Sequence, residues 1–435
     1  MLLKYIKYAI NNVMGMLVMT LDVIVDTYFI SVFAGTKGLA VLSLVIPLYT
    51  IIYALGSLVG TGSAIRFKLR RSVRGNTDTY FTQSILWTLI LWIPLLIIGI
   101  AMPRNLLGLL GGDVALRAFG ENNVRIILLG APILMCSYTF TDFAKVDRDV
   151  KLVNIAEICG SFAKIILDYV LIFKTPLGFC GAAVASILSH IVIILVSSIH
   201  YFKPKNHVNF QFGPLSIMHF MQCISCDFMT FLGEVLTAGI GILFNIMIHH
   251  LAGNPGIAAY GIITNLALLV EVVFEGISHA VQQIIHENFG KRDKKTERKF
   301  LRYGIVTTAL VETLTIILVW VKTDTLISTF NGGNNDLLYH YAFTGLRLYA
   351  LGFILAGINV VLISYYSATS NEIQAMVGAV MRSVVAIVGC AIVLTTFLGM
   401  NGKWLCFIAA EAVTLLVMAV MRHWRKQWIE REKIE

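Results

Sequence analysis

Long apolar runs separated by short polar or glycine-containing gaps recur along the whole chain. Each run is about 20 residues long, the length that an α-helix needs to cross a hydrocarbon core of about 30 Å. Hydropathy, turn residues and charge together predict twelve helical spans, and an even number places both termini on one side of a membrane. The predicted spans are 6–33, 39–64, 82–102, 121–143, 153–173, 179–202, 225–251, 256–285, 303–323, 339–366, 375–396 and 402–421.

The second half of this pattern repeats the first. Four short landmarks occur twice, in the same order and with nearly the same separation along the chain, which indicates two six-helix bundles. Because six is even, the two bundles have the same orientation, and this parallel repeat is one that alternating-access transporters use. The paired landmarks are Gly38 with Gly256, Gly112 with Gly333, Arg125 with Arg347, and Leu177 with Leu398.

The repeat predicts the domain boundaries. We expect a first lobe of six spans at 1–205 and a second lobe of six spans at 225–421. Between them, 206–224 is predicted as a cytoplasmic linker that contains an amphipathic interfacial helix. The last segment, 422–435, is predicted as a basic cytoplasmic tail.

Composition supports the membrane assignment. Hydrophobic residues make up 57% of the 435 residues and charged residues only 14%, with a mean hydropathy of +0.79. A soluble protein carries about 25% charged residues. The net charge of +9 comes from basic clusters between the apolar runs or after the last one, which is the positive-inside pattern of a multi-pass cell-membrane protein with cytoplasmic termini rather than of a nucleic-acid binder. These clusters are 66–74, 145–151, 290–302 and 422–433.

Motifs for catalysis or for a cofactor are not found in the sequence. The pair Cys223 and Cys226 forms a lone CxxC without ligand histidines, so structural cysteines are favoured over a metal or redox site. The sequence contains neither an HExxH motif nor a Walker A motif, which leaves direct ATP drive unsupported. We therefore expect no enzyme activity, no cofactor and no tightly bound metal.

Three polar groups of the first lobe lie at one predicted depth. At 1.5 Å rise per residue, Asp26, Asp168 and Ser186 lie about 9 to 13 Å below the outer surface. Asp22 precedes Asp26 by one turn, and Lys164 precedes Asp168 by one turn. A buried charge costs roughly 2.5–3.5 kcal/mol even on lenient insertion scales, so such groups face a cavity or one another. A structural ion pair and a cation or proton site both explain the cluster, and the shared depth favours the functional site.

Acidic residues of the second half occupy other positions. Glu271 and Glu275 are four residues apart on one helix face, and Gln282 continues the same helix. Glu234 lies in the seventh span. We expect these four residues as candidates for a second cavity, with a neutral structural role left open for Glu234.

Several stretches resemble the multidrug and toxic compound extrusion (MATE) transporters of the MOP flippase superfamily, and the bacterial DinF-like branch above all. The resemblance implies a V-shaped antiporter that expels substrate as Na⁺ or H⁺ enters. The family's first-span acid falls on Asp26, its fifth-span acid on Asp168 and its sixth-span hydroxyl on Ser186, while Lys164 replaces an asparagine that is frequent one turn before the fifth-span acid. The stretches are "VDTYFISVFAGTKGLAVLSLVIPLYTIIYALGSLVGTGSA" (25–64), "FAKVDRDVKLVN" (143–154), "ILDYVLIF" (166–173), "LGFCGAAVAS" (177–186), "GISHAVQQIIHENFGKRD" (276–293) and "LGMNGKWLCFIAAE" (398–411).

The resemblance and the residues together lead to a functional expectation. We expect a monomeric exporter of small, cationic or amphipathic organic compounds that works in lipid and exchanges its substrate for H⁺ or Na⁺. A Na⁺ ion held by Asp26 and Asp168 is one hypothesis for coupling. The other is that the Lys164 ammonium fills the place of that ion and leaves the acids to carry a proton. A lipid-linked precursor flippase of the same superfamily is the alternative function.

Overall fold

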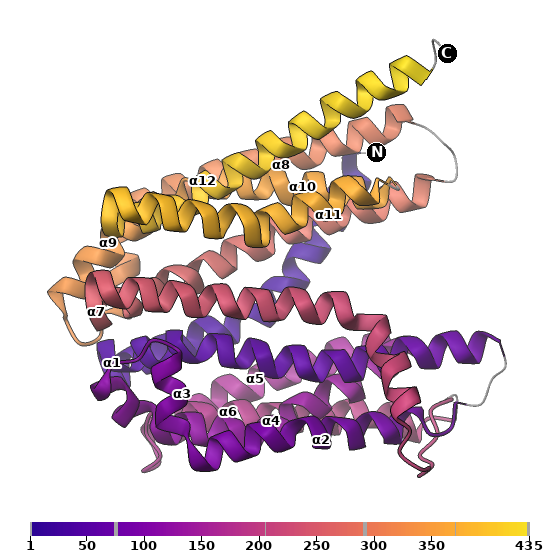
Figure 1. The fold of residues 1–435 in the computed structure, drawn as a ribbon, viewed down its shortest axis with the longest axis horizontal. Helices are drawn as coiled ribbons and strands as arrows, with labels where there is room; N and C mark the ends of the chain where they lie inside the picture. The colour runs from indigo at the N-terminus through magenta and orange to yellow at the C-terminus, as the bar shows by residue number, and fades with distance from the viewer. Residues whose placement is uncertain (1, 74–76, 205, 290–293, 370, 433–435) are drawn as a thin grey trace. The chain divides into compact units, whose positions relative to one another are not determined.

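The structure is a computed structural model that describes residues 2–73, 77–204, 206–289, 294–369 and 371–432. Parts of the predicted basic clusters at 66–74 and 290–302, and the end of the predicted tail, lie outside these residues. Helices account for nearly all of the described chain, and strands are absent from it (Figure 1). The elements are α1 (Leu2–Ser72), α2 (Tyr80–Ala101), α3 (Pro103–Leu109), α4 (Val114–Val146), α5 (Val150–Phe173), α6 (Cys180–Ser198), η1 (Ile199–Phe202), α7 (Ile217–Phe289), α8 (Lys294–Phe330), α9 (Asp336–Ala350), α10 (Phe353–Ala368), α11 (Glu372–Val380), η2 (Met381–Val385) and α12 (Ala386–Glu432).

The helices are long enough and apolar enough for the predicted membrane fold. Within the described residues, seven helices pass that test, and α9 with α10, bent by 44°, makes an eighth. Three of the long helices are divided by a glycine with left-handed backbone, at Gly35, Gly253 and Gly399. Helix α5 adds a further span that includes charged side chains. These elements agree with twelve spans, so the prediction of an all-α integral membrane protein is confirmed.

The positions of the turns follow the predicted repeat. Gly35 and Gly253 occupy equivalent positions in the two halves and have φ of 55° and 60°. Gly178 and Gly399 form a second equivalent pair and have φ of 53° and 58°. Glycine adopts this region without the steric cost that a side chain brings, so the same residue type ends equivalent spans in both halves.

Two helix starts repeat in the same way. Asp113 caps α4 by accepting a hydrogen bond from the backbone N–H of Leu116 at 2.8 Å. Asn335, at the equivalent position of the second half, caps α9 by accepting from the N–H of Leu338 at 3.0 Å. Asp and Asn are preferred at this position because the side-chain oxygen satisfies an N–H that has no partner within the helix. The internal repeat is therefore visible in local geometry as well as in sequence.

Contacts divide the chain into two compact units. Val25–His250 forms one, here called the central unit, and Met1–Ile24 with Leu251–Glu435 forms the other, here called the flanking unit. The lobes predicted at 1–205 and 225–421 describe the repeat rather than these contacts, and that division stays a prediction. The predicted linker at 206–224 is non-helical up to residue 216, and α7 begins within it.

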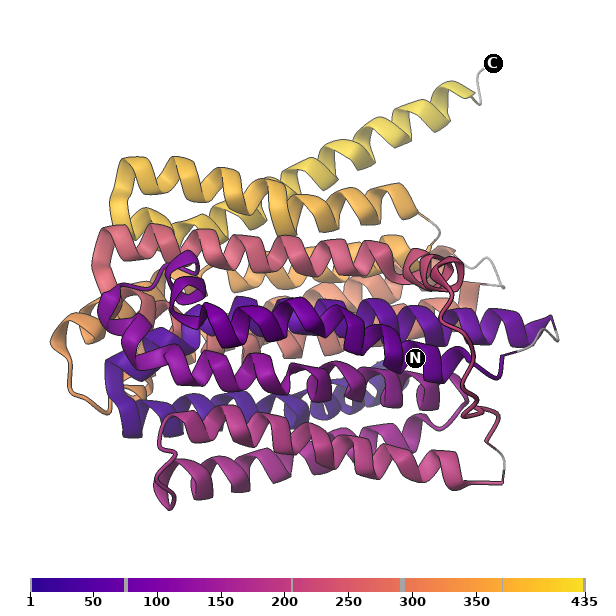
Figure 2. The same cartoon turned by 60° about the horizontal axis from the view of Figure 1, so that its bottom comes forward.

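Within each unit the helices pack lengthwise. In the central unit, α4 contacts α2, α5 and α6, and α5 contacts α6, as both Figure 1 and Figure 2 show. In the flanking unit, α8 and α12 each contact α9 and α10. Since each helix buries an apolar stripe against its neighbours, polar groups inside a unit are confined to a few positions and must find partners there.

A close approach between α1 and α4 positions the inner face of the central unit. A Cβ atom added to Gly56 would lie 2.9 Å from the Met135 Cα, and one added to Gly60 would lie 2.9 Å from the Thr139 backbone nitrogen. Both distances are below any ordinary contact, so larger residues would push the two helices apart. Glycine at these positions brings the side chains that flank them on α1 directly against α4.

Candidate functional site

Three charged side chains of the central unit meet where the sequence places them. The Lys164 ammonium lies 3.0 Å from Oδ2 of Asp26 and 3.0 Å from Oδ2 of Asp168. The side chains of Lys164 and Asp26 are 11% and 14% exposed, and Asp168 is completely buried. Two spans, α1 and α5, therefore contribute to one buried ionic cluster, which we call the coupling triad.

Local helix geometry accounts for the contact between Lys164 and Asp168. Lys164 and Asp168 are four residues apart on α5, so their side chains lie on the same face and the ammonium donates to the carboxylate. Asp26 comes from a segment of α1 far away in sequence. Its contact with Lys164 is a tertiary contact. The sequence predicted that Asp26 and Asp168 lie at a similar depth, but it did not predict this contact.

The charges of the triad do not cancel. Two carboxylates share one ammonium, and one negative charge remains if all three groups are ionised. In a buried site a proton or a further cation neutralises such a charge at the lowest cost. Within the described residues, Oδ1 of Asp26 accepts no hydrogen bond, so this oxygen is available to bind a proton or cation.

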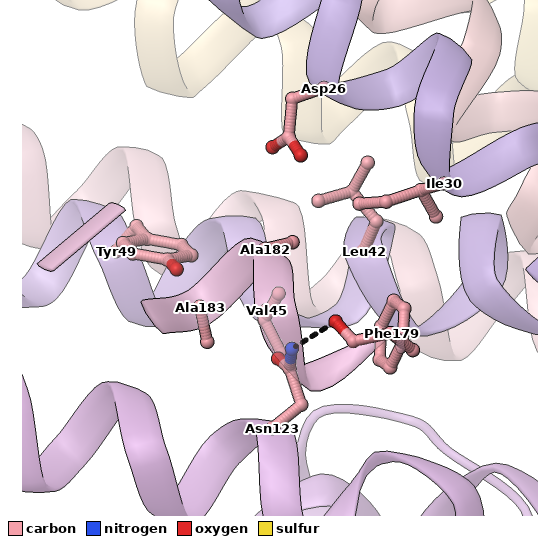
Figure 3. Close-up of a pocket in the computed structure, with 9 residues that line it drawn as sticks. All are labelled: Asp26, Ile30, Leu42, Val45, Tyr49, Asn123, Phe179, Ala182 and Ala183. Atoms are coloured by element: carbon pink, nitrogen blue, oxygen red, sulfur yellow. Dashed lines mark hydrogen bonds between the residues drawn. The ribbon is translucent and has the colours of Figure 1, made fainter. Parts of the chain in front are cut away.

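A small cavity opens beside Asp26. Figure 3 shows the carboxylate of Asp26 directed toward it. The space that the centre of a water molecule can occupy is about 20 Å³, which is enough for one water. The cavity thus admits water or a small ion beside the triad, and it is too small for a drug-sized compound. Its lining residues are Asp26, Ile30, Leu42, Val45, Tyr49, Asn123, Phe179, Ala182 and Ala183.

Ser186 lies close to the triad, although not in direct contact with it. Its hydroxyl donates to the Ala182 carbonyl at 3.1 Å, one turn earlier in α6. Tyr49, which lines the cavity with Asp26, lies near Ser186 and is close enough to interact electrostatically with all three charges of the triad. Sequence reasoning treated Tyr49 as one aromatic among several, and its place one step from the triad is a finding of the structure.

The triad also bears on the sodium hypothesis. A Na⁺ ion bound by both Asp26 and Asp168 would lie between their oxygens, and the Lys164 ammonium already occupies such a position. In the part of the chain that the structure describes, no three His, Cys, Asp or Glu side chains are grouped as metal ligands. The ammonium and a Na⁺ ion would therefore compete for the same position between the two carboxylates.

The other predicted site residues are divided between the two units. Asp22 belongs to the flanking part of α1. Glu234 is half-buried in the central unit, whereas Glu271 and Gln282 are half-buried and Glu275 is exposed in the flanking unit. The grouping of these acids and of Gln282 around one cavity stays a prediction.

The flanking unit contains a second buried ionic cluster that was not predicted as a site. The Arg382 Nε donates to Oε1 of Glu411 at 2.7 Å, and the Asn359 amide donates to Oε2 of Glu411 at 2.7 Å. Glu411 is 2% exposed. The residues lie on three helical segments far apart in sequence, so no spacing rule relates them. We call them the arginine cluster.

One further acid in the flanking unit also escaped sequence reasoning. Glu312 of α8 is completely buried, and neither of its carboxyl oxygens has a hydrogen-bond partner within the described residues. In the sequence, the only sign of a buried acid at this position was a single glutamate within an apolar run.

Comparison with known proteins gives a consistent result. The family model MatE matches residues 13–170 and 230–392. The chain is similar to the multidrug export protein MepA of Staphylococcus saprophyticus, with 23% identity over 424 residues that cover 95% of this chain and 92% of the relative. MepA of Staphylococcus aureus is 22% identical over 419 residues, with the same two coverages of 95% and 92%.

Solved structures match the fold over almost the whole length. An inward-facing conformation of a multidrug resistance MATE family transporter of the MOP superfamily has a TM-score of 0.85 at 19% identity, covering 95% of this chain and 96% of the other. An outward-facing conformation has a TM-score of 0.71 at 20% identity, covering 98% and 96%. At these identities the likeness shows a shared fold.

Proposed function

We propose that this chain, which belongs to the MatE family of membrane transporters, exports small organic compounds in exchange for protons by alternating access. The relatives named as multidrug export proteins support an exporter. The observation that carries proton coupling is the position of the Lys164 ammonium between Asp26 and Asp168.

The chemistry of the triad supports protons over sodium ions. With the ammonium bound to one oxygen of each carboxylate, Asp168 is paired with a positive charge and Asp26 keeps an oxygen directed to the cavity. A proton that binds there neutralises the remaining charge, and its release restores that charge. Because the three groups are in direct contact, uptake or release of this proton changes the net charge of the whole triad.

The proposed substrates are cationic or amphipathic compounds. Tyr53 and Tyr138 form an edge-to-face pair with ring centroids 5.0 Å apart, and Asp142, Asp227 and Glu234 are close enough to interact electrostatically with Tyr53. Aromatic faces and carboxylates together favour flat organic cations. This group of aromatic and acidic residues in the central unit supports the substrate class and leaves the individual compounds open.

The proposed setting is the cell membrane, with both termini in the cytoplasm. The basic clusters at the ends of the spans support this orientation through the positive-inside rule. We propose a monomer that works with organic substrate and membrane lipid, and without nucleic acid, enzyme activity or cofactor.

A lipid-linked precursor flippase is the alternative, and the contacts argue against it. Such a protein needs basic groups that are available to bind phosphate. Lys164 is held by two carboxylates, and Arg382 is paired with Glu411. These two buried bases are thus already neutralised by acids, which supports export of cations.

The test is transport by purified protein in proteoliposomes. The uptake of a panel of fluorescent organic cations is measured under three conditions: with a pH gradient alone, with a Na⁺ gradient alone, and without any gradient. The proposal expects cation transport that follows the pH gradient and is unchanged by Na⁺. Transport that follows Na⁺ alone would contradict proton coupling, and no transport of any cation would contradict the substrate class.

A further inference from the structure

Two polar side chains of α8 lie one helical turn apart inside the flanking unit. Thr308 and Glu312 are four residues apart, so they share one face of the helix. Both are completely buried. Within the described residues, the Thr308 hydroxyl and both carboxyl oxygens of Glu312 have no hydrogen-bond partner. Most buried polar groups in folded proteins do have one, so this pair requires a physical explanation.

The other threonines of α8 show what the usual arrangement is. Thr313 donates to the Ala309 carbonyl at 2.7 Å, and Thr315 donates to the Val311 carbonyl at 3.0 Å. A threonine in an apolar helix generally satisfies its hydroxyl in this way. Thr308 does not, so its hydroxyl remains available to another group on the face that it shares with Glu312.

Helix α10 covers this face of α8, and the two helices run side by side (Figure 1). A Cβ atom added to Gly357 of α10 would lie 2.2 Å from Cγ2 of Thr308, 3.5 Å from Cγ of Glu312 and 3.4 Å from Cβ of Phe274. We call the contact of Thr308 and Glu312 with Gly357 the α8–α10 interface. Thr308, Gly357 and Phe274 carry no charge, and Glu312 forms no ion pair within the described chain.

These surroundings determine the protonation state of Glu312. An ionised carboxylate that is buried without an ion pair or a hydrogen-bond donor costs several kcal/mol even after the protein relaxes. A buried acid in such a place therefore keeps its proton and stays neutral. While the α8–α10 interface is closed, the proton on Glu312 is thus a bound ligand of the flanking unit.

The internal repeat argues against a purely architectural acid. The repeat landmarks are 218 to 222 residues apart, so Glu312 corresponds to one of the residues 90–94 of α2. None of those five residues has an ionisable side chain. A group needed to build a six-helix bundle is expected in both halves, as Arg125 and Arg347 are. Glu312 is therefore specific to the second half.

The two polar groups also make the closed α8–α10 interface less stable than an apolar one. Each buried polar group without a partner costs about 1–3 kcal/mol, and water satisfies both groups when α8 and α10 separate. Neither Thr308 nor Glu312 has a hydrogen bond to α10 that would have to break first. The interface is thus easier to open at this point than apolar packing of the same shape.

We propose that Glu312 is a second proton-binding site of the transporter. It holds a proton while α8 and α10 are in contact, and it gives that proton to water when the two helices separate. The O–H bond of the carboxyl breaks, and its electron pair stays on the carboxylate. The interface closes again only after a proton binds, because the ionised form is too costly to bury. The inference rests on the proposed proton coupling and adds a second proton to each transport cycle.

The test variant is Glu312→Gln, which keeps the shape of the neutral acid and is unable to exchange a proton. Glu372→Gln is the matched control, because Glu372 is an exposed acid of the same unit in the first turn of α11. Each protein is reconstituted, and H⁺ flux and substrate flux are measured in parallel. Substrate counterflow at equal pH involves no net proton movement, so it reports folding and substrate binding separately.

Infrared spectroscopy gives a second readout that does not depend on transport. A protonated carboxyl has a C=O stretching band that a carboxylate and an amide lack. The wild type and Glu372→Gln should show this band from Glu312 at neutral pH, and Glu312→Gln should lose it.

The expected result is a change in stoichiometry alone. The ratio of H⁺ to substrate in Glu312→Gln should fall to about half of the wild-type value, because one of two proton-binding sites is lost. Its counterflow should stay at the wild-type rate, and Glu372→Gln should match the wild type in both measurements.

The other outcomes overturn the second proton site, each in its own way. An unchanged ratio in Glu312→Gln shows that the acid takes no part in coupling, and an unchanged carboxyl band shows that Glu312 binds no proton at neutral pH. Equal losses of H⁺ flux and counterflow show a structural role. A wild-type protein without pH-driven flux overturns the proposed proton coupling itself, whereas failure of the second site alone leaves that flux intact.

Discussion

The coupling triad and the arginine cluster are both buried, and they differ in the base that each contains. Lys164 lies 3.0 Å from an oxygen of Asp26 and of Asp168, and Arg382 donates to Glu411 at 2.7 Å. A buried lysine is able to release its proton, whereas an arginine guanidinium stays charged under all ordinary conditions. The first cluster therefore contains a base that is able to take part in proton exchange, and the second contains a fixed charge.

The carboxylates differ as well. Asn359 donates both to Oε2 of Glu411 and to the Glu411 backbone carbonyl, so the side chain is fixed from two directions. Asp26 has an oxygen that faces a water-sized cavity. In line with the proposed function, we propose that the ion pair beside the cavity serves coupling, and that the ion pair with a third hydrogen-bonding partner serves stability.

The largest expected effect comes from Asp26. Asp26→Asn keeps the size of the side chain and removes the charge that binds a proton, so pH-driven transport should fall at least about a hundredfold. Thermal unfolding in detergent should change little, because the Lys164 ammonium keeps Asp168 as its partner. Transport at the wild-type rate would show that Asp26 is structural and would remove the distinction between the two clusters.

Glu411 should show the opposite pattern. Glu411→Gln removes the carboxylate that accepts from the buried Arg382 at 2.7 Å, which should lower the free energy of unfolding by about 3 kcal/mol. The H⁺ to substrate ratio of the protein that remains folded should be unchanged, as measured by parallel flux assays. The double substitution Arg382→Met with Glu411→Leu should recover most of the stability, since replacing both partners leaves no unpaired charge. A changed ratio would place the arginine cluster in the coupling reaction.

Asp147, which follows α4 and lies outside the predicted spans, serves as a reference for effects of pH on stability. Burial alone would raise the pKa of Asp147, but hydrogen bonds from the His207 N–H and from Arg71 outweigh it, so the pKa lies below its usual value. A lowered pKa contributes stability that is present above the pKa of the unfolded chain and is lost as pH falls through the folded-state pKa.

Asp147→Asn should therefore destabilise the protein at neutral pH by about 2 kcal/mol, the order of a charged hydrogen bond. The difference from wild type should shrink as the pH falls below the unfolded-state pKa of Asp and toward the folded-state value. Denaturation midpoints measured across acidic to neutral pH check this, with pH-driven transport as the second readout. A difference in midpoint that stays constant with pH, or a loss of proton coupling, would contradict a purely structural role.

The fold could be predicted because its signals are local and repeated. Apolar runs set the spans, and glycines such as Gly35 and Gly253 set the turns between them. Depth counting brought Asp26 and Asp168 to one level, since rise per residue is fixed in a helix. Depth counting does not predict how a helix is rotated about its axis or which helices lie beside it. The contact between Asp26 and Lys164 could therefore be found only in the structure.

The parts that sequence reasoning missed depend on tertiary contacts. Arg382 and Glu411 lie on different helical segments, and their pairing has no local pattern. Ser57 and Thr61 are four residues apart on one face of α1. Their partners were found only in the structure, where they donate to Asp227 on α7 and Asp142 on α4.

The central claim is that the Lys164 ammonium takes the place of a coupling Na⁺ ion, and transport under separate ion gradients tests it most directly. Wild-type protein and Lys164→Asn are compared in proteoliposomes under an imposed pH gradient and an imposed Na⁺ gradient. The account predicts that wild type responds to pH and ignores Na⁺, and that Lys164→Asn loses pH coupling or gains Na⁺ dependence. Strong Na⁺ dependence of the wild type, unchanged in Lys164→Asn, would contradict it.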